Sequence, residues 1–135
     1  MDVLIGLHSL WRWVVLIVVL VALVRGLVGW LRGGDWTSGD RTLALVTTIA
    51  VDIQLVLGLL VYIVAKGWTL GAFLAYVHPL IMIIAIAVIH IASVRIRRAE
   101  TPVAKHRTLA LGLILAMVLI TAAIPSDAWS RAWHA

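Results

Sequence analysis

The sequence contains no cysteine, little charge and few prolines, and these shortages remove whole classes of function. Without cysteine, disulfides, iron–sulfur clusters, thiol catalysis and covalent haem attachment are excluded. Any metal or haem must therefore be ligated by histidine, methionine or a carboxylate. Charged residues make up only 13% of the chain, about half the share usual in soluble domains. There is also no nucleotide-binding loop, HExxH motif or nucleophile–base arrangement, so no enzyme active site is indicated.

Apolar residues, by contrast, make up 64% of the 135 residues. They gather in four stretches, at about 3–24, 43–65, 72–94 and 109–124. Each is close to the roughly 20 helical residues that cross a bilayer. The first stretch has no basic segment before it and no cleavage site, so we expect it to be retained. The sequence predicts an all-α, integral membrane four-helix bundle formed by a single domain, residues 1–135.

The basic residues indicate which way the bundle is oriented. Eight of the eleven Lys and Arg residues fall in or beside the first and third linkers: Arg25, Arg32, Arg41, Arg95, Arg97, Arg98, Lys105 and Arg107. Because cytoplasmic loops carry the excess of Lys and Arg, both termini are expected on the non-cytoplasmic side of a bacterial inner membrane. The net charge of +5 thus sets topology and does not indicate nucleic-acid binding.

An internal repeat suggests that the bundle is built from two tandem helical hairpins. The pentapeptide RTLAL occurs at Arg41–Leu45 and again at Arg107–Leu111. Upstream of these copies, His8 precedes Arg25 by 17 residues, and His78 precedes Arg95 by the same 17. The match is short, but it puts the two histidines at corresponding positions of the two hairpins.

His8 and His78 are the leading candidates for cofactor ligands. At 1.5 Å per residue, each lies about 25 Å from the inner boundary marked by Arg25 and Arg95. Two imidazoles at equal depth on two helices are what a bis-histidine haem b requires. Two other interpretations stay open: each histidine is a structural hydrogen-bonding residue, or a single histidine ligates a chlorophyll magnesium.

A second group of polar residues lies deeper in the predicted spans. Arg12 follows His8 by one helical turn and has two candidate partners, a haem propionate or the Asp52 carboxylate at similar depth, with Gln54 nearby. His90 has no counterpart in the repeat, so we expect it to bond to a neighbouring helix or to contribute to a quinone pocket. His106 and His134 lie in polar ends and are expected to be solvated.

The residues His8-Ser-Leu-Trp-Arg12-Trp13, Asp52-Ile-Gln54 with Gly58, His78, and Ile124-Pro125 resemble a family of small bacterial four-helix membrane proteins labelled cytochrome b. The resemblance covers most of the chain. It implies haem ligation by His8 and His78 and gives no role to His90. The usual two-haem pattern, with paired histidines in each of two helices, is absent.

These observations predict an electron-transfer module with one haem b, or alternatively a cofactor-free accessory subunit of a respiratory or photosynthetic complex. Either function places the chain among lipids and beside other membrane subunits, with quinone as a further candidate partner. Trp129 and Trp133, one helical turn apart, are expected to form an aromatic ridge that anchors the tail in headgroups or docks on a neighbour.

Overall fold

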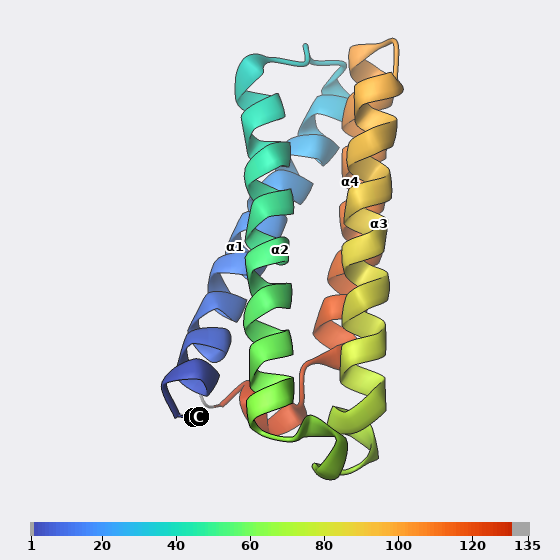
Figure 1. Cartoon of the computed structure of the whole chain (residues 1–135). Helices are drawn as coiled ribbons and strands as arrows, with labels where there is room; N and C mark the ends of the chain where they lie inside the picture. The colour runs from blue at the N-terminus through green and yellow to red at the C-terminus, as the bar shows by residue number, and fades with distance from the viewer. Residues whose placement is uncertain (1, 131–135) are drawn as a thin grey trace.

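The computed structural model describes residues 2–130, and within them it contains four long helices and no strand (Figure 1). The helices are α1 (Asp2–Arg32), α2 (Ser38–Val64), α3 (His78–Arg98) and α4 (Pro102–Ala123). A 3₁₀ turn, Gly67–Thr69, and a π-helical turn, Phe73–Val77, connect α2 to α3. A last 3₁₀ turn, Ser126–Ala128, follows α4. The prediction of an all-α chain with four helices is confirmed.

Each helix falls on one predicted apolar stretch but is generally longer than it. The largest difference is in α1, which continues to Arg32 although the apolar run ends at residue 24. A helix can continue into polar sequence because its backbone hydrogen bonds are internal. All four helices are long and apolar enough to cross a membrane, judged by length and composition.

Local sequence sets the ends of the helices on the side of the first and third linkers. Gly33 ends α1 with a φ of 65°, a left-handed conformation that glycine adopts without strain. Thr37 and Asp40 form a capping box at the start of α2, in which each side chain accepts from the other's backbone N–H. Thr101 caps α4 by accepting a hydrogen bond from the backbone N–H of Ala104, and Pro102 follows at the first helical position.

The helices alternate in direction, so the beginning of α1 and the end of α4 lie at the same end of the bundle (Figure 1). We call this the terminal end, and the end that holds the α1–α2 and α3–α4 connections the linker end. α4 packs closely against both α1 and α3, and α2 packs mainly on α1. α2 and α3 contact each other less, which leaves one seam of the bundle loosely packed.

Small residues allow the helix backbones to approach closely along α4. A Cβ added at Gly26 would lie 3.0 Å from the backbone nitrogen of Ala110, and one added at Gly112 would lie 2.7 Å from Cβ of Ala92. Ala110 and Ala116 are completely buried. Close approach through small residues is how helices gain packing energy where lipid removes the hydrophobic drive. The duplication into two tandem hairpins stays a prediction.

Candidate functional site

The structure brings His8 of α1 and His78 of α3 together near the terminal end. Their ring centroids are 6.4 Å apart, and the ring planes are nearly perpendicular at 86°. The equal spacing to Arg25 and Arg95 predicted that these side chains share one depth, and the ring contact agrees with that expectation. Ligation of a haem by this pair stays a prediction.

His78 is oriented by a hydrogen bond through one of its two ring nitrogens. It begins α3 directly after the π-helical turn, with Pro79 following it in the first turn. Its Nδ1 lies 2.7 Å from the carbonyl oxygen of Ala123 on α4, so Nδ1–H donates to that carbonyl. The neutral ring then presents the lone pair of Nε2. Histidines that ligate metals are commonly fixed in this way.

His8 packs on one face of α2, where the residues are spaced four apart. Gln54 Nε2 donates to the His8 carbonyl at 3.1 Å, and Trp11 Nε1 donates to the carbonyl of Ala50 at 2.8 Å. One turn further along α2, a Cβ added at Gly58 would lie 3.1 Å from Cε1 of the His8 ring. The lack of a side chain at Gly58 therefore leaves space for the His8 imidazole.

The His8 ring itself lacks a hydrogen-bond partner within residues 2–130. Its Nδ1 is buried and unpaired there. A buried polar atom without a partner carries a desolvation penalty, and it is often a sign of a bound group. One imidazole is thus fixed by the Ala123 carbonyl, and the other has a buried Nδ1 without a partner among the described residues.

Arg12 does not pair with Asp52, so the ion pair considered from the sequence is wrong. Arg12 instead donates from NH2 to the carbonyl of Ala128 at 3.0 Å, and its guanidinium lies 5.4 Å from the Trp13 ring centroid. Its buried Nε has no partner among the described residues. The depth comparison placed Arg12 and Asp52 at similar heights, but Arg12 bonds to the segment after α4 and Asp52 bonds to α3.

The expected cluster of Arg12, Asp52 and Gln54 is likewise not formed. Asp52 Oδ1 lies 2.7 Å from Nε2 of His90 on α3, and Gln54 bonds to the His8 backbone. The interpretation that His90 bonds to a neighbouring helix agrees with this contact. Both side chains of the Asp52–His90 pair remain about half exposed, at 46% and 48%. The pair thus faces outward across the loosely packed seam between α2 and α3.

The linker end holds a buried polar cluster that sequence reasoning missed. His106, expected to be solvated, is completely buried, and its Nε2 lies 2.8 Å from the carbonyl oxygen of Asp35. The Trp36 ring packs on it at 5.1 Å. A Cβ at Gly29 would collide with the His106 ring. Gly29, which has no side chain, was the sequence signal for this site. Nothing in the sequence, however, indicated that His106 packs against Gly29.

Arg25 and Asp40 form the ion pair beside this cluster. Arg25 donates from Nε to Oδ1 at 2.6 Å and from NH2 to Oδ2 at 3.1 Å. Asp40 also accepts from the backbone N–H and the hydroxyl of Thr37. Bidentate pairs of this kind are strong and fix geometry. The pair joins α1 to the start of α2 and has a structural role.

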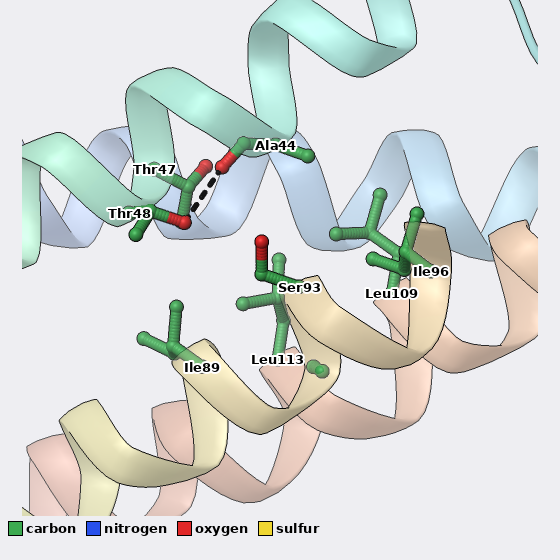
Figure 2. Close-up of a pocket in the computed structure, with 9 residues that line it drawn as sticks. Ala44, Thr47, Thr48, Ile89, Ser93, Ile96, Leu109 and Leu113 are labelled. Atoms are coloured by element: carbon green, nitrogen blue, oxygen red, sulfur yellow. Dashed lines mark hydrogen bonds between the residues drawn. The ribbon is translucent and has the colours of Figure 1, made fainter. Parts of the chain in front are cut away.

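The seam between α2 and α3 contains a small internal gap (Figure 2). Thr47 and Thr48 on α2 face Ser93 on α3 across it. Both threonine hydroxyls donate to carbonyls of their own helix, at Leu43 and Ala44. The gap measures about 10 Å³, room for about one water molecule. It therefore has no space for an organic cofactor.

The tail that follows α4 folds back on α1 as far as the structure describes it. The ring of Trp129 packs edge-on against Trp13 with centroids 6.0 Å apart. Trp133 and His134, which entered the sequence-based expectations, lie outside the described residues. The predicted aromatic ridge of the tail therefore stays a prediction.

Comparison of the chain with protein-family models, with curated proteins and with solved structures finds no match. The resemblance to small cytochrome b-like membrane proteins accordingly stays a hypothesis that rests on the residues quoted for it.

Proposed function

We propose that the chain is a multi-pass protein of the bacterial inner membrane that holds one haem b between His8 and His78 and serves in electron transfer. The observation that carries the proposal is the 6.4 Å separation of the two ring centroids. Two metal–imidazole bonds of about 2 Å each, plus about 1 Å from each nitrogen to its ring centre, predict about 6 Å between centroids. The centroid separation is therefore compatible with one iron shared by the two rings.

The surroundings of the pair support the same assignment. The Ala123 carbonyl fixes the tautomer of His78, and Nδ1 of His8 has no hydrogen-bond partner among the described residues. Arg12, with a buried unpaired Nε one turn from His8, is positioned for a carboxylate such as a haem propionate. A haem held by His8 and His78 would supply one-electron transfer and would not bind oxygen. The protein's part is to hold, orient and shield that group.

The topology proposed with this function follows from charge. The linker end carries eight of the eleven Lys and Arg residues, and this charge bias supports a cytoplasmic position for that end. The terminal end, with the His8–His78 pair, then faces the non-cytoplasmic side. The haem would lie near that surface, so its electron donor and acceptor belong to neighbouring proteins or to the lipid phase.

An accessory role without a cofactor is the second candidate, favoured by the exposed faces of α2 and α3. In the most apolar 18-residue segment of α2, and in that of residues 73–98, only 17% is buried inside the chain. The corresponding share for α4 is 39%. Such faces are available to lipid or to helices of a larger respiratory or photosynthetic complex. In that case His8 and His78 stabilise the bundle by their ring contact and by the hydrogen bond from His78 to the Ala123 carbonyl.

Haem content separates these two candidates. The protein purified in mild detergent from haem-replete cells should contain about one non-covalent haem per chain by the pyridine haemochrome assay. Substitution of either His8 or His78 by leucine should remove it. A colourless protein that co-purifies with other membrane subunits would instead support the accessory role.

A further inference from the structure

Asp52 and His90 form an outward-facing polar pair that the proposed haem site does not use. Asp52 lies close to the middle of α2, and His90 meets it from α3 with 2.7 Å between Oδ1 and Nε2. Both side chains are about half exposed. In a bilayer, ionisable residues at this depth are expensive and normally face the interior of a bundle. The pair therefore points to a larger bundle, in which helices from outside this chain cover it.

The face that holds this pair is otherwise apolar and is formed by α2 and α3, which lie side by side (Figure 1). Ile49 and Val56 are exposed about one turn to either side of Asp52 on α2. The surface of α2 beside Asp52 is hollowed into a shallow depression of about 410 Å³, lined otherwise by Ile49, Ile53, Val56 and Leu57. An apolar face with a polar pair near its centre has the character of a contact between membrane helices, where polar side chains bond across the interface.

Two copies of one chain have the same orientation in a membrane, which limits how such faces can meet. A two-fold axis along the membrane normal leaves every residue at its own depth and turns the same face of both copies toward each other. The rotation places α2 of one copy opposite α3 of the other. Asp52 and His90 touch within one chain and so share one depth. In the two-fold arrangement, Asp52 of one copy therefore meets His90 of the other, and the face is complementary to itself.

A second pair of opposite charges fits the same arrangement. Arg41 precedes Asp52 by 11 residues, about three helical turns, so it lies on the same side of α2, about 16 Å nearer the linker end. Glu100 follows His90 by 10 residues, just past the end of α3, which places it about 15 Å nearer that same end. Both are exposed, and neither forms an ion pair within residues 2–130. Arg41 of one copy then lies at the depth of Glu100 of the other, and both are fully charged at neutral pH.

We propose that the α2–α3 face is a homodimer interface, in which α2 of each copy packs on α3 of the other about an axis along the membrane normal. Asp52 and His90 of both copies form one polar cluster shielded from lipid, and Arg41 pairs with Glu100 of the second copy. A second copy fits better than an unrelated helix because the chain itself supplies both members of each pair. The inference does not depend on haem at the terminal end, so a colourless protein would still dimerise.

Disulfide cross-linking tests which faces meet, because the chain has no cysteine of its own. Val56 on α2 and Ala87 on α3 are exposed and each lie about one turn from the polar pair toward the terminal end. Val56→Cys and Ala87→Cys, on two differently tagged full-length copies expressed together, should form a mixed disulfide when the membranes are oxidised. Ile17→Cys with Val118→Cys, on exposed positions of α1 and α4, is the control and should form none. A mixed disulfide from the control pair only, or from neither pair, would overturn the proposal.

Exchanging the acid and the base tests the two-fold pairing itself. The double variant Asp52→His with His90→Asp keeps the pair within each chain, so it should fold and dimerise with itself. Against the parent, however, it would set carboxylate opposite carboxylate and imidazole opposite imidazole. Energy transfer between dyes on Ser126→Cys, in phosphatidylcholine vesicles, should therefore show association of parent with exchanged chains at least about tenfold weaker than association within either.

Association of parent with exchanged chains as strong as within either, or a parent that stays monomeric in these vesicles, would overturn the proposal. The cross-linking test leaves the polar pair unchanged, so it decides the matter if the exchanged variant does not fold. Haem content plays no part in either readout, so failure of the haem assignment and failure of the dimer are separate results.

Discussion

The imidazole rings of His8 and His78 lie with centroids 6.4 Å apart and planes nearly perpendicular, although one is near the start of α1 and the other begins α3. Only His78 has a hydrogen bond that fixes its ring, through Nδ1 to the Ala123 carbonyl. The His8 ring is held by packing on Gly58 and keeps an unpaired Nδ1. This asymmetry makes His8 the position where ligand exchange is best tested.

Replacing His8 by methionine should keep a haem and raise its reduction potential. Met/His ligation raises the potential relative to ligation by two histidines. Methionine is flexible enough to fill irregular space, and Gly58 leaves room beside it. A redox titration of His8→Met against the parent measures the shift. An unchanged potential with full haem content would mean that His8 is not a ligand.

Filling the space at Gly58 should displace the His8 ring and lower haem retention. A leucine side chain there would meet the ring, since even a Cβ would lie 3.1 Å from Cε1. Gly58→Leu should therefore purify with markedly less haem per chain, measured spectrally. Val56→Leu, on an exposed position of the same helix, is the control and should retain it. Full retention in Gly58→Leu would show that the His8 position is not critical.

The linker end should depend on the lack of a side chain at Gly29. Gly29→Ala would place a methyl group in the buried His106 ring, and overpacking of this kind costs about 1–3 kcal/mol. Gly6→Ala is the matched control in the same helix, because nothing lies within 4 Å of its added Cβ. Thermal unfolding in one detergent compares them, with Gly6→Ala neutral or slightly stabilising. Equal stability of the two variants would contradict the burial of His106.

The Arg25–Asp40 pair should contribute measurably to stability. Asp40→Asn removes the charge from a buried carboxylate that pairs in bidentate fashion with the partly exposed Arg25 and also caps α2, for a loss of about 1–3 kcal/mol. Asp35→Asn makes the same change at an exposed side chain of the preceding connection. Chemical denaturation in detergent should show destabilisation of Asp40→Asn only. A neutral Asp40→Asn would mean that the pair forms without net gain.

Topology can be tested with single cysteines, because the chain has none of its own. Cysteine at Ser126, in the turn after α4, should react with a membrane-impermeant maleimide on intact spheroplasts. Cysteine at Glu100, in the α3–α4 connection, should react only after the membrane is ruptured. Both positions are exposed in the fold, so a difference reports sidedness. The reverse pattern would place the termini in the cytoplasm.

The sequence predicted how deep a residue lies along the bundle axis better than it predicted which helix its side chain contacts. The number of helices follows from apolar runs, and the shared depth of His8 and His78 follows from a fixed rise per residue. The partners of Arg12 and Asp52 were wrong because helices that are apolar all round do not reveal which face meets the core. Burial of His106 was missed because the polar residues around it suggested a solvated end.

The visible spectrum of the purified protein tests the central claim most directly. The dithionite-reduced minus oxidised difference spectrum should contain the α-band of a b-type haem. The band should vanish in His8→Leu and in His78→Leu and persist in His90→Leu, whose ring pairs with Asp52 and not with the haem site. A parent protein without any such band, or a band that survives both His8→Leu and His78→Leu, would contradict the account.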